Sequence, residues 1–359
     1  MDCTANRIPY RQTGYFSKTV LDYIDQAPGL QPFFSHPSSL SGIRQAIQAR
    51  ESFATNRPLL VQELKKQYAS VAVTESVQQN IENLLDPSTF TITTAHQNNL
   101  FTGPLYFIYK ILHAIRLATT LRESLPEYRF VPVYYIGSED ADLAELNHIY
   151  LNGEKLAWNT QQTGAVGRMT IDKELVKLIG LIEGQLGVLP HGSELVSLLR
   201  ECYTEGDDLQ TATFRLVNAL FGEYGLIVLL PDNAALKQQV SAIFEDDLLH
   251  QAASGIVEST VARLQEAGYK VQANPREINL FYLEGNTRER IEKINDGPEG
   301  KWGVVNTDKQ FTREELLQEL HDHPERFSPN VILRGYTRKR SCRMLRLSEG
   351  EERSLTGCN

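Results

Sequence analysis

The sequence predicts an α/β fold with a doubly wound parallel sheet and helical insertions. A β-branched segment at residues 89–94 leads into a polar loop, a long apolar helix and a second strand rich in Val and Tyr at 128–137. Strand, helix, strand is the unit of a parallel sheet, and its crossover is right-handed. A later apolar run at 226–230 is typical of a strand that is buried on both faces.

Length and charge narrow the function classes. With 359 residues the chain is long enough for two domains or for one core with insertions. A net charge of -9, with no basic stripe before the last two dozen residues, opposes a nucleic-acid partner. No window approaches the roughly 18 apolar residues of a membrane span, and residues 1–7 contain no apolar leader core. We therefore expect a cytoplasmic protein without a membrane partner.

Cysteine spacing gives no sign of a metal site. The four cysteines are scattered and form no Cys-x-x-Cys pair, which opposes both a zinc site and a disulfide framework. We expect reduced, structural thiols. These residues are Cys3, Cys202, Cys342 and Cys358.

The first half of the chain begins with helices. Residues 15–85 show apolar positions at helical spacing, with a Pro-rich break at 31–37, and are expected to wrap the core. After the first strand, a helix is predicted from Thr102, as the N-cap, to about residue 125, with Pro104 in its first turn.

The second half alternates helices with extended segments. A turn at Asn152-Gly153 follows a short strand, and helices are predicted at about 171–186, 192–204 and 208–224. Asp232 is expected to cap one long helix that ends near residue 267. Extended pieces at 278–283 and 290–294 flank a hairpin turn, and Thr312 with Glu315 has the spacing of a capping box. The predicted divisions are 1–88 (helical wrap), 89–160 (first half of the core), 161–224 (helical insertion), 225–334 (second half, incomplete) and 335–359 (tail).

The loop after the first strand is the first candidate site. His96, Gln97 and the two following asparagines offer donors and acceptors, Gly103 permits close approach to the backbone, and Lys110 lies two turns into the helix. Such a loop, ahead of a helix at the carboxyl end of a strand, suits a phosphate or a carboxylate. It matches neither the Gly-x-Gly-x-x-Gly fingerprint nor a P-loop, so neither NAD nor a P-loop nucleotide is supported. The alternative is a polar loop that only caps the helix.

Three carboxylates after the second strand form the second candidate site. Glu139, Asp140 and Asp142 crowd together at the carboxyl end of that strand. They suit an ammonium group or the work of a general base. The alternative is a solvated acidic turn.

A third candidate is the polar entry to the apolar strand near residue 280. Arg276 can pair with a ligand carboxylate through two hydrogen bonds, or with a neighbouring glutamate for structural reasons only. His36, His148 and Tyr106 are better explained as packing residues when they are taken alone.

Taken together, these segments closely resemble the BshC family of bacillithiol biosynthesis cysteine-adding enzymes. The resemblance covers nearly all of the chain up to Arg334. The motifs that carry it are 94–97, 100–106, 109–110, 131–133, Glu139 with Asp140 and Asp142, 145–147, 164–169, 274–283 and 327–334.

The resemblance implies a Rossmann-like core with insertions of the connecting-peptide type, followed in the family by a coiled-coil domain that forms a homodimer. The implied ligase reaction joins the carboxyl group of cysteine to the amino group of glucosaminyl malate, giving bacillithiol. Because an amide does not form from a free carboxylate and an amine at neutral pH, an activated cysteine, or ATP or another activating nucleotide, is required.

The family reading also assigns roles to residues. Gln97, Gly103, Tyr106 and Lys110 would bind an anion, together with His96 in the same loop. Glu139, Asp140 and Asp142 would hold or deprotonate the amine, and Asn147, Arg276 and Asn279 would complete the cleft. Two alternatives to this function remain open: a nucleotidyl or aminoacyl transferase on the same fold, and an inactive, truncated remnant.

The chain departs from the family pattern at three places. Ala141 stands where the family usually has His, and Ala95 stands where it has Gly. After Arg334 the sequence no longer follows the family pattern. If residues 336–359 are back-translated into DNA and read one nucleotide out of phase, the family pattern can be recovered. We infer that the tail is frameshifted, that the coiled-coil domain and the last core elements are missing, and that the basic tail packs poorly. Dimerisation is then not expected for this chain.

Overall fold

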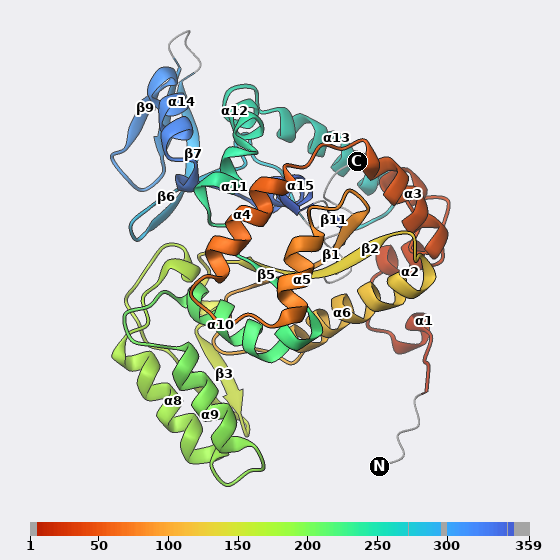
Figure 1. Ribbon diagram of the computed structural model, residues 1–359. Coiled ribbons are helices and arrows are strands. Elements are labelled where there is room, and N and C mark those ends of the chain that lie inside the picture. The colour runs from red at the N-terminus through yellow and green to blue at the C-terminus, as the bar shows by residue number, and fades with distance from the viewer. Residues whose placement is uncertain (1–5, 272, 296–299, 343, 348–359) are drawn as a thin grey trace.

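A four-stranded parallel sheet forms the core of the computed structural model, which describes residues 6–271, 273–295, 300–342 and 344–347 (Figure 1). The strand order is β11-β1-β2-β5. β1 and β2 pair in register from Thr89 opposite Arg129 to Gln97 opposite Gly137, so both strands end at one edge of the sheet. The strands are β1 (Thr89–Gln97), β2 (Arg129–Gly137), β5 (Ile227–Leu229) and β11 (Met344–Leu347).

Helices cover both faces of this sheet. Tyr134 and Tyr135 are consecutive in β2 and therefore point to opposite faces. The ring of Tyr134 contacts Phe107 of α6 (Tyr106–Ser124) edge-on at 5.4 Å between centroids, whereas Tyr135 lies under Arg338 of α15 (Val331–Cys342) at 4.7 Å. The prediction of a doubly wound α/β core is thus confirmed.

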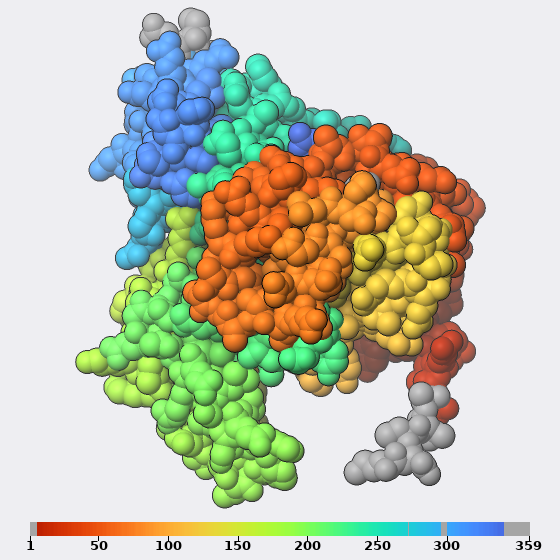
Figure 2. Space-filling model, in the orientation of Figure 1, coloured from red at the N-terminus to blue at the C-terminus, as the bar shows by residue number. Residues whose placement is uncertain are grey.

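The N-terminal residues form short helices, and two of them join the main core. Leu64 of α4 and Val77 of α5 belong to the same buried cluster as Val133 of β2 and Val228 of β5. In Figure 2 the corresponding orange segment makes up the centre of the visible face. The helices are α1 (Tyr10–Thr13), α2 (Lys18–Ile24), η1 (Gln31–Phe33), α3 (Leu40–Glu51), α4 (Arg57–Tyr68) and α5 (Glu75–Asn83).

Between β2 and β5 the chain forms a helical lobe with its own core. Trp158, Leu175 and Leu199 are buried together in this lobe, which projects at the lower left of Figure 1. The predicted turn at Asn152-Gly153 joins two short antiparallel strands, and both residues have positive φ. The elements are α7 (Leu143–Leu146), β3 (His148–Leu151), β4 (Glu154–Ala157), η2 (Val166–Arg168), α8 (Lys173–Leu186), α9 (Gly192–Cys202), α10 (Leu209–Phe221) and η3 (Gly222–Tyr224).

The long helix predicted after Asp232 is wrong, since three helices occupy this stretch. They are α11 (Ala234–Gln238), α12 (Ser241–His250) and α13 (Ala252–Glu266). Gln251 takes a left-handed conformation, φ 54°, which stops a continuous helix. The N-cap is Asn233, whose side chain accepts a hydrogen bond from the Leu236 amide, because Asp232 is engaged elsewhere.

A five-stranded antiparallel sheet follows, in the order β10-β6-β7-β8-β9. The predicted hairpin is present between β6 and β7, and the predicted capping box of Thr312 and Glu315 starts α14. The elements are β6 (Leu280–Glu284), β7 (Thr287–Asn295), β8 (Lys301–Val304), β9 (Gln310–Thr312), α14 (Arg313–Asp322), η4 (Pro324–Arg326) and β10 (Phe327–Pro329).

Two further expectations are corrected. Helix α6 begins at Tyr106 with Leu105 as its N-cap residue, so Thr102 and Pro104 belong to the preceding turn. The tail expected to pack poorly is ordered as far as it is described: Thr337 and Arg338 are buried, and β11 pairs with β1. Residues 343 and 348–359 lie outside the described residues, and the frameshift itself stays a prediction.

Cys202 is buried and free, as expected for a structural thiol. Among the helices within the described ranges, we find none with the length and apolar character needed to cross a bilayer.

The outer edge of β5 is covered by side chains of α4 instead of by another strand. The Gln67 amide donates to the Val228 carbonyl at 2.8 Å and accepts from the Leu230 amide at 2.9 Å, as a neighbouring backbone would. The buried Tyr68 hydroxyl accepts from the Val228 amide at 2.7 Å. These contacts satisfy an edge that would otherwise be open to pairing.

We predict that Tyr68→Phe lowers the free energy of unfolding by about 1–3 kcal/mol, because the Val228 N–H is left buried without a partner. Urea unfolding of the purified chain measures the change. Tyr128→Phe is the matched control, since its hydroxyl contacts Glu51 near the surface at 3.4 Å and its loss should cost less than about 0.5 kcal/mol. Equal losses in the two variants would contradict this account of the edge.

Candidate functional site

The residues that follow β2 lie at the carboxyl edge of the parallel sheet, where ligands of open α/β sheets bind. Glu139 is 5% exposed, and a second segment pairs with the backbone on either side of it. The Gly167 amide donates to the Ser138 carbonyl and the Val166 amide donates to the Asp140 carbonyl, both at 2.8 Å. A Cβ at position 167 would lie 2.5 Å from Ser138, so glycine is required for this close approach.

The Glu139 carboxylate is held by groups from two distant elements. One oxygen contacts the ammonium group of Lys237 on α11, and the other accepts a hydrogen bond from the Ser328 hydroxyl of β10 at 3.2 Å. Lys237 is itself only 5% exposed. A buried pair of this kind persists only where both charges find partners.

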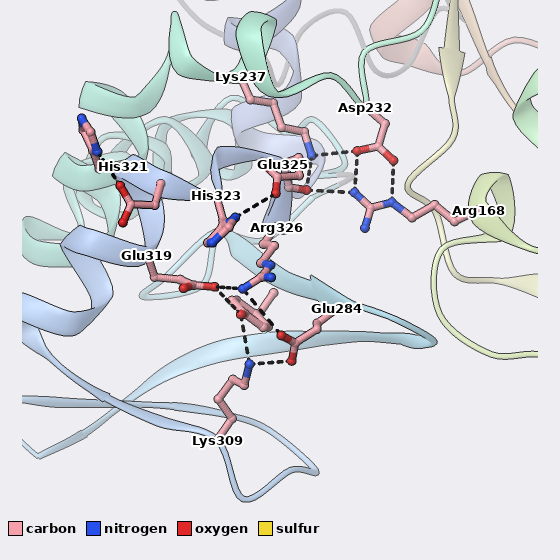
Figure 3. A network of polar contacts seen from close by, with 12 residues as sticks. Arg168, Asp232, Lys237, Glu284, Lys309, Glu319, His321, His323, Glu325 and Arg326 are labelled. Atoms are coloured by element: carbon pink, nitrogen blue, oxygen red, sulfur yellow. Dashed lines mark hydrogen bonds and ion pairs between the residues drawn. The ribbon is translucent and has the colours of Figure 1, made fainter.

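Asp232 extends this arrangement at the end of β5 (Figure 3). Arg168 donates to its two oxygens at 2.6 and 2.7 Å, and Lys237 lies 3.3 Å from one of them. Arg168 and Lys237 also donate to the Glu325 carbonyl, both at 2.9 Å. Burial alone would raise the pKa of Asp232, but the contacts with Arg168 and Lys237 outweigh it and hold the pKa below its ordinary value.

Asp140 is paired separately. The guanidinium group of Arg334, on α15, donates to its two oxygens at 2.7 and 3.2 Å, and the Gln97 side chain also hydrogen-bonds to it. Burial opposes the charged form of Asp140, yet Arg334, with Arg288 and Gln97, lowers the pKa of the carboxyl group below its ordinary value. The site therefore holds a permanently ionised carboxylate at neutral pH.

The predicted loop is only partly joined to these carboxylates. Gln97 reaches Asp140, but His96 precedes it in the strand and points to the other face of the sheet. There the His96 ring lies 5.2 Å from that of Tyr106, its Nδ1 is 2.9 Å from the Asn99 amide nitrogen, and Lys110 Nζ lies 3.5 Å from the Ala95 carbonyl. The structure thus splits the expected cleft into two polar positions, one on each side of β1.

The other predicted residues lie apart from the carboxylates. Asp142 is exposed and its side chain does not cap α7. Asn147 bonds to the Trp158 carbonyl at 3.4 Å and contacts His148, next to the β3–β4 hairpin. Arg276 is exposed.

Asn279 is fully buried, and its side chain contacts Asn330. Its side-chain oxygen accepts from the Asn330 amide at 2.9 Å, and its own amide donates to Asp247 at 3.2 Å. Asn330 in turn accepts from the Ile332 amide at 2.8 Å at the start of α15, the helix that presents Arg334. Asn279 therefore contacts the residue that precedes the Arg334 helix.

The four cations that surround these carboxylates were not selected from the sequence. Arg168 and Arg334 stand inside motifs that carried the resemblance, and Asp232 follows a buried strand just as Glu139 does, so the strand-end rule could have found it. Lys237 and Arg288 carry no local signal.

A small cavity adjoins the network. It measures about 20 Å³, room for one water molecule, and Tyr135, Glu139, Lys237 and Thr337 are among its lining residues. Within the described parts of the chain, no group of three or more His, Cys, Asp or Glu side chains is arranged to hold a metal ion.

The Asp140–Arg334 pair makes stability depend on pH. Because the folded pKa of Asp140 is lowered, its contribution is complete above the unfolded value near 3.9 and is lost as pH falls through the folded pKa. We predict that Asp140→Asn lowers the unfolding free energy at pH 7 by about 3–5 kcal/mol and reduces its fall below about pH 4. Denaturant unfolding at several pH values measures both effects.

The control for this experiment is the exposed neighbour Asp142. Asp142→Asn should leave the stability at pH 7 within about 0.5 kcal/mol of the wild type. If Asp140→Asn behaved like this control, the pairing with Arg334 would have no energetic importance.

Gly103 sustains the first loop through its conformation. Its φ is +60°, and a Cβ there would lie 2.6 Å from the Asn99 side chain. Gly153 has φ +85° with open space around it. Gly153→Ala therefore introduces the same kind of backbone strain without a steric clash. We predict that Gly103→Ala costs about 1–3 kcal/mol and exceeds the cost of Gly153→Ala, measured by thermal unfolding. Equal costs would show that Asn99 moves aside freely.

Comparison with known proteins identifies relatives over most of the chain. Residues 1–339 match the family model described as "Bacillithiol biosynthesis BshC, N-terminal Rossmann-like domain". Proteins named "Putative cysteine ligase BshC" are 43% identical in Flavobacterium psychrophilum and 42% identical in Flavobacterium johnsoniae, each over 91% of this chain and 61% of the relative. One from Cytophaga hutchinsonii is 41% identical over 92% of this chain and 60% of its own length. The chain thus spans about three fifths of the length of these relatives.

Proposed function

This chain belongs to the BshC family, and on that premise we propose that it joins the carboxyl group of L-cysteine to the amino group of glucosaminyl malate to form bacillithiol. The observation that supports the proposal is the set of buried, cation-paired carboxylates at the carboxyl edge of the sheet. The same proposal places the reaction in the cytoplasm.

The chemistry asks for two kinds of group. The amine must lose its proton to become a nucleophile, and the carbonyl oxygen of the activated cysteine gains negative charge as the nitrogen attacks. A C–N bond forms, the activating group leaves with its electron pair, and one proton leaves the nitrogen. Carboxylates that attract the amine and cations that stabilise the oxyanion are both required.

The edge of the sheet offers both kinds of group. Asp140 stays ionised beside Arg334 and suits an ammonium group that must be held rather than deprotonated. We assign the proton-accepting role to Glu139, whose partner Lys237 would stabilise the carboxylate before the transfer. Gln97 orients Asp140 through its hydrogen bond.

The second polar position, across β1, completes the proposal. His96, Tyr106 and Lys110 gather there beside the loop that Gly103 shapes. We assign to it an anionic group of an activating co-substrate, since imidazole, hydroxyl and ammonium groups suit a phosphate or a carboxylate.

We predict that Glu139→Gln abolishes product, because the amide cannot take the proton and leaves Lys237 with Asp232 as its only remaining carboxylate partner among the described residues. The assay is mass spectrometry of bacillithiol in cells that depend on this gene alone, supported by circular dichroism of the purified variant. Glu127→Gln, which alters an exposed pair with Arg44, should keep wild-type product.

Two outcomes would contradict the proposal. Unchanged product with Glu139→Gln would remove this residue from the reaction. No product from the wild-type chain at saturating substrates would favour an inactive remnant.

A further inference from the structure

Arg288 lies beside the carboxylates but makes no pair with them. It is the second residue of β7, directly after Thr287. The Thr163 hydroxyl donates to the Asn286 carbonyl of that turn at 2.8 Å, and the backbone of Gly164 packs so closely there that a Cβ would lie 2.7 Å from Asn286. The same segment continues to Val166, whose amide donates to the Asp140 carbonyl. One loop therefore fixes the β6–β7 turn against the end of β2.

The guanidinium group of Arg288 is held rigidly and is short of partners. It stacks over the Phe281 ring, with the guanidinium carbon 3.8 Å from the ring centroid. Its Nε is buried and has no hydrogen-bond partner, and Arg288 forms no ion pair with any residue the structure describes. Stacking on the ring fixes the plane of the Arg288 guanidinium group. Its N–H groups, which form a planar fork, can then donate to another acceptor.

Neighbouring charges show which kind of acceptor is missing. Burial and the nearby Arg334 lower the pKa of Arg288 to about 10, and attraction to Asp140 and Glu139 only partly offsets them. Asp140 already binds Arg334 through both oxygens, and Glu139 already contacts Lys237. Asp232, the next carboxylate along this edge, is shared by Arg168 and Lys237. Each of these three carboxylates thus has a cation other than Arg288 as its partner.

We propose that Arg288 binds an oxyanion of a ligand, a carboxylate or a phosphate, at the carboxyl edge of the sheet. The fork of an arginine matches either group through two parallel hydrogen bonds. Assigning that group to a substrate carboxylate rests on the function proposed above, whereas the binding site itself requires no turnover. Arg288 would then place the ligand beside Asp140 and Glu139.

The test measures thermal unfolding of the purified chain in a low-salt zwitterionic buffer, with L-malate or with inorganic phosphate added. Wild-type protein should show a saturable rise in Tm with at least one of the two anions. Arg288→Met should unfold at the same or a higher temperature without anion, because it removes an uncompensated cation, and should bind the anion at least tenfold more weakly. Arg288→Lys, which keeps the charge and loses the fork, should bind with intermediate affinity.

Arg44→Met is the matched control, since Arg44 forms an exposed pair with Glu127 and should leave the anion response unchanged. A response to malate alone assigns the site to a carboxylate, and a response to phosphate alone assigns it to a phosphate group of a co-substrate. The proposal is overturned if Arg288→Met keeps the full response, or if the wild type responds to neither anion. Because no product is measured, loss of catalysis by the whole chain would not affect the result.

Discussion

The structure depends on the pairing of two adjacent carboxylates at the end of β2, the buried Glu139 and the partly buried Asp140. A buried carboxylate is costly unless a cation and hydrogen bonds compensate it. Those partners come from distant parts of the chain: Lys237 on α11, Ser328 on β10 and Arg334 on α15. A hydrogen bond from Ser328 therefore ties the antiparallel sheet to the parallel core, and the Arg334–Asp140 ion pair ties α15 to it. Well-packed apolar residues would serve stability as well or better, and the network lies at the edge where open α/β sheets bind ligands, which is why we propose a function for it.

Local patterns in the sequence were enough to predict much of the fold. Strands β1, β2 and β5, the β3–β4 turn and the capping box of α14 each depend on neighbouring residues, and the structure has them close to the expected positions. No strand was predicted at β4, β8, β9 or β10. The break between α12 and α13 was missed because it depends on one left-handed residue, Gln251, whose identity does not demand that conformation. β11 was missed because its residues looked like an unpacked basic tail.

The residues of the candidate site were also only partly predictable from the sequence. The strand-end rule located Glu139 and Asp140, because the carboxyl ends of parallel strands share an edge. It could not supply Lys237 or Arg288, since only the tertiary fold brings them near. Side chains alternate between the two faces of a strand, so the sequence could have shown that His96 and Gln97 point to opposite faces. The single cleft that was expected is therefore two separate polar positions in the structure. Asn279 was selected as a cleft residue, and its side chain contacts Asn330, which precedes the helix that carries Arg334.

A crystal structure of this chain with bound L-malate tests the central claim most directly. Our account predicts a malate carboxylate within hydrogen-bond distance of the Arg288 guanidinium group, with Asp140 still paired to Arg334 and Glu139 to Lys237. Malate bound elsewhere, or Glu139 and Asp140 turned toward solvent without their cations, would contradict the account.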